Sequence, residues 1–207
     1  MSKTQVIAVI IILSVLFLVF SKTSTVDTQR ETLAPHATIL AFGDSLTYGY
    51  GAVNSAYPLV LEELTHHRVV NAGISGEVSV VGLQRFSKVL EQYKPSLVVL
   101  CHGGNDILRR KSNDALKENL RKMIILSKER GVQVLLVGVP GFGIFGAKTL
   151  PLYKELSIEE SVMYEGAVLE KIENDAGLKS DQIHPNAEGY KLMADSFNKV
   201  LKEYGVI

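Results

Sequence analysis

The stretch Ala37–Thr47, which reads Ala-Thr-Ile-Leu-Ala-Phe-Gly-Asp-Ser-Leu-Thr, decides the fold. Its apolar residues from Ile39 to Phe42 are typical of a buried strand, and the run stops abruptly at Gly43-Asp44-Ser45. Glycine gives the backbone freedom for a tight exit, while Asp and Ser favour turns and helix starts over strand interiors. Ligands of open α/β sheets bind at the carboxyl ends of the strands. The stretch therefore predicts chemistry at Ser45, although a serine that only caps the next helix fits the same residues.

The rest of the chain continues this alternation of short apolar runs and helical patterns. The patterns predict strands over 38–42, 68–71, 97–101, 132–139 and 161–164, and helices from about 55 and over 78–93, 113–130, 167–174 and 186–204. We expect the helix from 55 to bury Leu59, and the helix over 78–93 to bury Val81. Such alternation predicts one α/β domain over 37–207, in which helices cover both faces of a parallel sheet.

The amino-terminal residues form a separate segment. An apolar run from Val6 to Phe20, interrupted only by Ser14, follows Lys3. As a helix it would reach about 22 Å, which is short of a hydrocarbon core of about 30 Å. This length is typical of a signal peptide or a short membrane anchor over 1–22, followed by a polar linker over 23–36. The basic charge ahead of the run predicts an exported domain, either periplasmic or anchored to the inner membrane and facing outward.

Composition narrows the classes of partner. The 207 residues suit one domain, and 22 basic residues balance 22 acidic ones. No basic stripe is present that suits a phosphate backbone, so we expect no nucleic-acid partner. The single cysteine, Cys101, excludes an internal disulfide, and in a buried strand a free cysteine usually behaves as a small apolar residue.

Three polar residues suggest nucleophilic catalysis. Ser45 follows the first predicted strand, and Asp181 and His184 precede the last predicted helix. A serine hydroxyl needs an adjacent base, and histidine is the side chain best matched to that role. The imidazole in turn needs an acceptor on its other nitrogen. We therefore expect a triad in which His184 activates Ser45 and Asp181 orients His184.

Further residues at the strand ends suit an oxyanion hole. Gly73 follows the second predicted strand and Asn105 follows the third. The amides of Ser45 and Gly73 and the side chain of Asn105 are the expected donors, and each donor of this kind contributes about 3 kcal/mol in a transition state. No metal or cofactor is expected, and His66-His67 is interpreted as a solvated helix end rather than a pair of metal ligands.

Four blocks of the sequence resemble a known family. Gly43-Asp44-Ser45-Leu46, Asn71-x-Gly73, Gly103-x-Asn105-Asp106 and Asp181-x-x-His184-Pro185 are similar, in order, to the signature blocks of the SGNH (GDSL-type) hydrolases. The resemblance spans about 38–201 and is greatest to the bacterial thioesterase I/lysophospholipase and arylesterase branch. It implies a flavodoxin-like three-layer α/β/α sandwich, a five-stranded parallel sheet of order 2-1-3-4-5, and ester hydrolysis without a metal.

The substrate remains open between related classes. Apolar side chains near the strand ends favour a fatty acyl ester, thioester, lysophospholipid or aryl ester, and the residues expected to line the acyl site are Leu46, Ile107, Leu108, Phe142, Ile144 and Phe145. A carbohydrate O-acetyl esterase on the same frame is the nearer alternative, although the chain has no tryptophan for a sugar platform. A non-catalytic, membrane-tethered binding module is the other. The glycine-rich residues 140–152 are expected to form a mobile substrate loop.

Other polar residues near these blocks have simpler interpretations. Ser75 is a rival nucleophile, but Glu77 breaks the Gly-x-Ser-x-Gly pattern of a nucleophile elbow. Asp44 is expected to hold the turn before Ser45 through a hydrogen bond. We expect Asp106 to cap the segment that follows it, and His102 to be structural or, alternatively, to contact substrate.

Overall fold

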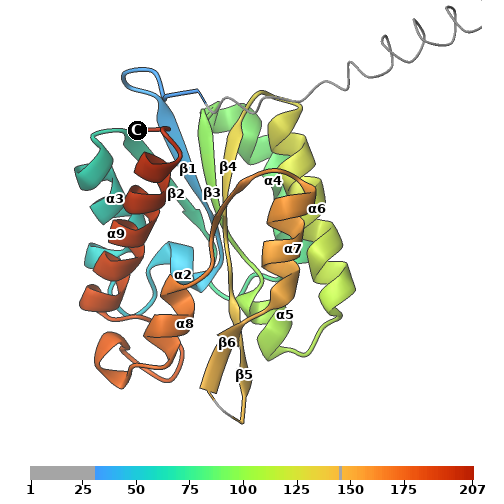
Figure 1. Ribbon diagram of the computed structural model, residues 1–207, viewed down its shortest axis with the longest axis vertical. Helices are drawn as coiled ribbons and strands as arrows, with labels where there is room; N and C mark the ends of the chain where they lie inside the picture. The colour runs from blue at the N-terminus through green and yellow to red at the C-terminus, as the bar shows by residue number, and fades with distance from the viewer. Residues whose placement is uncertain (1–30, 145) are drawn as a thin grey trace, which may run out of the picture.

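The strand exits identified in the sequence belong to one parallel sheet. The computed structural model describes residues 31–144 and 146–207 (Figure 1). The sheet has five strands in the order β2-β1-β3-β4-β7. Their bounds are Thr38–Gly43 for β1, Arg68–Gly73 for β2, Leu97–Cys101 for β3, Gln133–Val137 for β4 and Met163–Glu165 for β7. With β7 as the fifth strand, the predicted order 2-1-3-4-5 is confirmed.

Helices cover both faces of this sheet and complete three layers. Their bounds are Ser45–Tyr48 for α2, Tyr57–Thr65 for α3, Ser79–Tyr93 for α4, Gly104–Leu108 for α5, Asn113–Lys128 for α6, Pro151–Glu159 for α7, Val168–Glu173 for α8 and Ala187–Glu203 for α9, with short 3₁₀ turns at Val53–Ser55 and Ala176–Leu178. Helices α3 and α9 pack together on one face, and α4, α6 and α7 cover the other (Figure 1).

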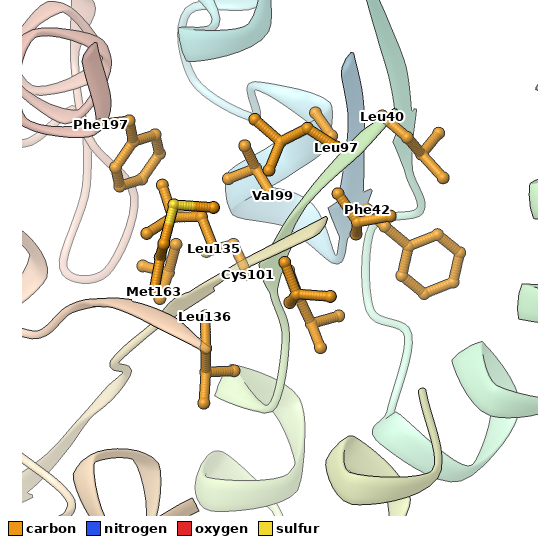
Figure 2. Close-up of a cluster of buried hydrophobic side chains, with 14 of the residues drawn as sticks. Leu40, Phe42, Leu97, Val99, Cys101, Leu135, Leu136, Met163 and Phe197 are labelled. Atoms are coloured by element: carbon orange, nitrogen blue, oxygen red, sulfur yellow. The ribbon is translucent and has the colours of Figure 1, made fainter. Parts of the chain in front are cut away.

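The apolar strands form the centre of the core. All residues of β3 are buried, as expected for a strand covered on both faces. Phe42 of β1 meets Phe86 of α4 with ring centroids 4.7 Å apart, and Tyr57 of α3 meets Phe197 of α9 at 5.1 Å. Phe42 and Phe197 thus lie on opposite sides of the strands in Figure 2.

Two helix faces differ from the sequence prediction. Leu59 is 50% exposed and Val81 is 46% exposed, so the prediction that both are buried is wrong. Helix α3 turns Tyr57 inward instead, and α4 turns Gly82 inward. These helices carry apolar residues on more than one side, so hydrophobicity alone does not identify the face toward the sheet. A Cβ at position 82 would lie 2.5 Å from His102 Nε2, so the buried face of α4 requires a glycine there.

A hairpin replaces the predicted mobile loop. Strands β5 (Pro140–Gly143) and β6 (Gly146–Thr149) pair antiparallel and project from the carboxyl edge of the main sheet (Figure 1). The Asn174 amide group exchanges two hydrogen bonds with the backbone of Ala147, of 3.0 and 2.8 Å. Glu170 accepts a third from Thr149 N at 2.9 Å. The partners that order this hairpin come from α8 and its carboxyl end, so the local sequence did not reveal them.

The first described residues pack onto the domain. Leu33 is buried, and its N–H donates to the Val206 carbonyl at 2.8 Å. Gln133 Nε2 donates to the Glu31 carbonyl at 2.7 Å. These contacts join the last part of the predicted linker to the domain. Within the described ranges, no helix has both the length and the apolar character needed to cross a membrane. The predicted signal or anchor over 1–22 lies outside the described residues.

Candidate active site

Three side chains from opposite ends of the chain meet at the carboxyl edge of the sheet. Ser45 begins α2 directly after β1, and His184 lies in the loop before α9. His184 Nε2 is 3.1 Å from Ser45 Oγ, although 139 positions separate the two residues. His184 Nδ1 is 2.8 Å from Asp181 Oδ2. The structure thus brings together the three residues that the sequence predicts for a triad.

The turn that presents Ser45 depends on its two preceding residues. A Cβ on Gly43 would lie 1.9 Å from the Cys101 carbonyl oxygen, so only glycine fits between β1 and β3 at this point. Asp44 Oδ1 accepts a hydrogen bond of 3.2 Å from Leu46 N, as the sequence predicts for a residue that holds this turn. Burial raises the pKa of Asp44. Its Oδ2 is buried and accepts no well-aligned hydrogen bond from the described residues.

The loop that carries Asp181 and His184 is closed by its own hydrogen bonds. Asp181 Oδ1 accepts from the N–H groups of Ile183 and His184, each at 2.8 Å. Ser180 N donates to the His184 carbonyl at 2.8 Å. Burial raises the pKa of Asp181, but the backbone N–H groups of His184 and Ile183 and the His184 ring outweigh it and lower this pKa to about 2. Asp181 is therefore a carboxylate at neutral pH and holds Nδ1 of His184 as the donor.

Tyr50 packs against the imidazole ring of His184. The sequence analysis did not predict this contact. The Tyr50 ring lies 4.4 Å from the His184 ring, centroid to centroid. Tyr190 Oη donates to the Tyr50 carbonyl at 2.9 Å. Gly51 has φ 88°, and a Cβ there would meet Ser180 Oγ at 2.1 Å, so this segment approaches the histidine loop closely. Only its position shortly after Ser45 hinted at this contact.

The predicted oxyanion donors are arranged unequally. The N–H of Ser45 donates to no described residue, and Asn105 lies in the first turn of α5, beside Ser45 in the same cavity. The N–H of Gly73, by contrast, donates to Asn71 Oδ1 at 2.9 Å. A Cβ on Gly73 would lie 2.2 Å from Tyr48 N, which shows that this glycine admits α2 rather than a substrate.

Three residues after Gly73, the turn between β2 and α4 offers another N–H group. Glu77 N bonds to the Ile74 carbonyl at 3.2 Å, and Gly76 has φ 78°, the left-handed conformation that a type II turn requires at this position. The Gly76 N–H donates to no residue in the described part of the chain. In this structure Gly76, rather than Gly73, has a free amide beside the strand ends.

The cavity beside Ser45 is small and largely apolar. Its free volume is about 30 Å³, well below the roughly 300 Å³ at the lower end for ligand pockets. Of the predicted acyl-site residues, Leu46, Leu108 and Phe142 line it. Residues that the sequence analysis missed are Val139, Pro140, Leu169, Glu173 and Ile183. They come from the carboxyl side of β4, from α8 and from the histidine loop, which only tertiary packing brings here.

The other predicted acyl-site residues lie elsewhere. Ile107 is not among the residues that line the cavity, and its Cγ2 is 3.9 Å from the position of a Cβ on Gly141. Ile144 is 97% exposed because the hairpin turns it outward. Phe145 lies outside the described residues. A larger cavity of about 670 Å³ occurs at the amino-terminal edge of the sheet, away from Ser45, and no histidine lines it.

Two further residues are structural. His102 is fully buried, with Nε2 3.2 Å from Glu77 Oε2, so it faces the core rather than the cavity. Asp106 accepts from Ser79 N at 2.7 Å and from Ser79 Oγ at 2.8 Å. The expectation that Asp106 caps the segment after it is therefore wrong, because its carboxylate holds the start of α4, which lies earlier in the chain.

The three-layer α/β fold presents Ser45 beside His184 on a Gly-Asp-Ser-Leu turn, without the Gly-x-Ser-x-Gly elbow. Comparison with known proteins gives the family. Residues 41–192 match the model of the GDSL-like lipase/acylhydrolase family, and the chain belongs to that family. The resemblance to SGNH hydrolases is thus confirmed, and the protein is an ester hydrolase.

Individual relatives agree with this assignment. The chain is 33% identical to the esterase TesA of Pseudomonas aeruginosa over 72% of its own length and 79% of the relative's. It is 30% identical to thioesterase 1/protease 1/lysophospholipase L1 of Escherichia coli over 80% and 83%. The crystal structure of TesA superposes with a TM-score of 0.73 at 28% identity, covering 81% of this chain and 99% of that structure.

Proposed function

We propose that the protein hydrolyses acyl esters or thioesters through Ser45, His184 and Asp181. The observation that carries this proposal is the contact of 3.1 Å between Ser45 Oγ and His184 Nε2. His184 takes the proton from Ser45 as its oxygen attacks the acyl carbonyl, and then gives that proton to the leaving alcohol or thiol. Water, activated by the same imidazole, releases the acid. Asp181 holds His184 in the tautomer that these steps need.

The oxyanion donors in this proposal are the Ser45 N–H, the Asn105 side chain and the Gly76 N–H. We propose the Gly76 N–H in place of the expected Gly73 N–H. The Gly73 N–H already donates to Asn71 Oδ1 at 2.9 Å and would have to break that hydrogen bond to reach an oxyanion. The Gly76 N–H has no such competitor in the described residues. Free donors aimed where charge develops are effective because they need no reorganisation during the reaction.

The substrate class follows from the apolar surroundings of Ser45. Leu46, Leu108, Phe142 and Leu169 line the cavity and suit an aliphatic or aryl acyl group. Exposed apolar side chains near the strand ends, Ile74 at 46% and Phe142 at 53%, offer further surface for a longer chain. Relatives named esterase, arylesterase and thioesterase/lysophospholipase support the same class. We therefore propose fatty acyl esters, thioesters or lysophospholipids as substrates.

A fluorophosphonate probe tests the nucleophile. We expect the wild-type protein to be labelled and the Ser45→Ala variant to remain unlabelled. Ser75→Ala is the matched control, because Ser75 is exposed on the neighbouring turn and should not affect labelling. An unlabelled wild type would favour the alternative of a non-catalytic binding module.

A series of p-nitrophenyl esters tests the acyl specificity. We expect kcat/KM to rise from the acetyl ester to esters of longer acyl chains, because each added methylene buries more apolar surface on the protein. A maximum at the acetyl ester would instead favour the carbohydrate O-acetyl esterase alternative. Acetylated oligosaccharides would then be the next substrates to assay.

We also propose that the domain is exported. The support is the apolar run from Val6 to Phe20 behind Lys3. Expression of the full chain in a bacterial host, followed by protease treatment of spheroplasts, tests this location. Export predicts that the domain is degraded by the added protease, and a protected domain would refute it.

A further inference from the structure

The turn that carries Gly76 is held from two sides. On its outer side, Arg109 Nη2 donates to the Gly76 carbonyl at 2.9 Å. On its inner side, the next residue, Glu77, turns its carboxylate into the core with 2% of the side chain exposed. The peptide group between Gly76 and Glu77 therefore has an anchor at each end. Because this peptide is next to the one that carries the Gly76 N–H, the two anchors also limit where that N–H points.

The inner anchor is a cluster of the buried Glu77 and His102 with the partly buried Arg85. Arg85 Nε and Nη2 donate to the two oxygens of the Glu77 carboxylate at 2.7 and 2.6 Å. The same Nη2 donates to the Ala72 carbonyl at 2.9 Å, at the end of β2. The guanidinium lies 4.1 Å from the centroid of the Phe42 ring on β1. Glu77 is thus tied to the ends of β1 and β2, the strands that lead to Ser45 and to the turn.

His102 completes this cluster from β3. Its Nε2 is 3.2 Å from Glu77 Oε2, and its Nδ1 is buried with no partner among the described residues. Because the Glu77 carboxylate can only accept hydrogen bonds, the imidazole nitrogen that faces it must be a donor. The geometry therefore assigns a proton to Nε2, which donates to Glu77. Glu77 then accepts from Arg85 and His102, and burial of its carboxylate is compensated.

The outer anchor connects the turn to the element that carries Asn105. Arg109 directly follows α5, and Asn105 lies in the first turn of that helix. The next residue, Asp106, accepts two hydrogen bonds from Ser79 at the start of α4, of 2.7 and 2.8 Å. Helix α5 and the residue that follows it are therefore linked to the β2–α4 segment at two points, one within the turn and one just after it. These links fix the position of the Asn105 side chain relative to that of the Gly76 N–H group.

We propose that Arg109 and Glu77 are positioning residues that hold the Gly76 N–H toward the oxyanion formed at Ser45. This inference rests on the proposed esterase function. Neither side chain touches the substrate in this scheme. Each acts on the direction of one N–H group, so loss of either side chain weakens binding of the oxyanion more than binding of the ground-state ester.

Arg109 gives the sharper test because it is exposed and its loss leaves the core intact. Removal of a whole oxyanion donor lowers kcat by a factor of about 100 to 1000. Misdirecting one donor should cost less, so we expect Arg109→Ala to lower kcat about tenfold with KM within about twofold of wild type. Arg109→Lys, which keeps a donor, should recover part of this loss. Arg110→Ala is the matched control and should leave kcat unchanged, because the Arg110 guanidinium makes no hydrogen bond or ion pair with the described residues.

The rate of fluorophosphonate labelling gives a second readout, because the phosphonyl oxygen occupies the place of the oxyanion. We expect it to fall in Arg109→Ala in proportion to kcat, while the thermal unfolding midpoint stays the same. Glu77→Gln should lower the same two rates, provided its unfolding midpoint shows a folded protein. An active wild type whose Arg109→Ala variant matches Arg110→Ala would overturn this inference and leave the esterase proposal intact. A wild type that hydrolyses no ester would refute both.

Discussion

Replacement of Asp181 by asparagine changes the hydrogen bonding of His184, and the resulting loss of kcat can be estimated from the hydrogen bonds of Asp181. The carboxylate serves three donors: the N–H groups of Ile183 and His184 at Oδ1, and His184 Nδ1 at Oδ2, all at 2.8 Å. An asparagine amide has one oxygen and one NH₂ group. If the oxygen accepts from the two backbone groups, the NH₂ faces Nδ1 and forces the imidazole proton onto Nε2. The nitrogen that faces Ser45 Oγ at 3.1 Å then cannot take its proton.

The opposite orientation of the amide restores the productive tautomer but points its NH₂ at two backbone donors. A buried unsatisfied donor costs about 1–3 kcal/mol; because these two N–H groups lie at the exposed surface, we take the lower part of that range for each, which places this orientation about 2–4 kcal/mol above the first. Since 1.36 kcal/mol corresponds to a factor of ten in rate, Asp181→Asn should lower kcat by about 30- to 1000-fold. KM should change little, because Asp181 is not among the residues that line the cavity.

Hydrolysis of p-nitrophenyl butyrate measures this loss. Asp175→Asn is the matched control: Asp175 Oδ1 accepts from Gly177 N at 2.8 Å on the exposed surface, and an asparagine oxygen can do the same. We expect the control to retain wild-type kcat. If folded Asp181→Asn keeps more than about a third of the wild-type kcat, the tautomer argument is wrong.

The same substitution has a defined effect on stability. The pKa of Asp181 is lowered in the fold from 3.8 to about 2, so its carboxylate contributes stability that is complete above the unfolded value. That contribution is lost as the pH falls through about 2. The side chain is 45% exposed, so solvent screens the effect and we expect it to be small. In urea denaturation, the free-energy difference between wild type and Asp181→Asn should be constant above about pH 5 and shrink toward pH 2.

Other variants test the packing around the site. Gly73→Ala places a Cβ 2.2 Å from the backbone of α2 and should lower the thermal unfolding midpoint by several degrees, whereas Gly143→Ala, whose Cβ would have an ordinary contact at 3.6 Å, should not. Tyr153→Phe removes the donor, at 2.9 Å, to a buried carbonyl just after β3, and should cost about 1–3 kcal/mol in the free energy of urea unfolding; no measurable change would show that this carbonyl finds another donor. Phe142→Ala removes an apolar wall of the cavity and should lower kcat/KM severalfold more for the octanoyl than for the acetyl p-nitrophenyl ester. Equal losses on the two esters would place the acyl chain elsewhere.

Much of the architecture could be predicted because its signals are local. The run from Ile39 to Phe42 and the stretch Leu97–Cys101 contain enough consecutive apolar residues to identify buried strands, and both stretches are strands in the structure. The sequence predicts that Ser45, Asp181 and His184 act together for a chemical reason, and the structure places their side chains in contact. A hydroxyl nucleophile, a base and an acceptor are rarely interchangeable with other residue types.

Helix faces and the hairpin were less predictable, because they depend on distant partners. Val81 is as apolar as many core residues, yet α4 turns Gly82 inward because only a glycine clears the His102 ring. The hairpin is ordered by Asn174 and Glu170, which follow it by more than twenty positions. No pattern within residues 140–149 reports those contacts.

The sequence by itself determined the parallel sheet, the order of its elements along the chain and the chemical groups available at its carboxyl edge. These properties follow from residue type and from periodicity, which are local. Only the tertiary structure decided that the Gly73 amide donates to Asn71, while the Gly76 amide has no acceptor among the described residues, and that Glu77 lies in the core between Arg85 and His102. The direction of an N–H group depends on which acceptor folding brings beside it, and residue type does not specify that acceptor.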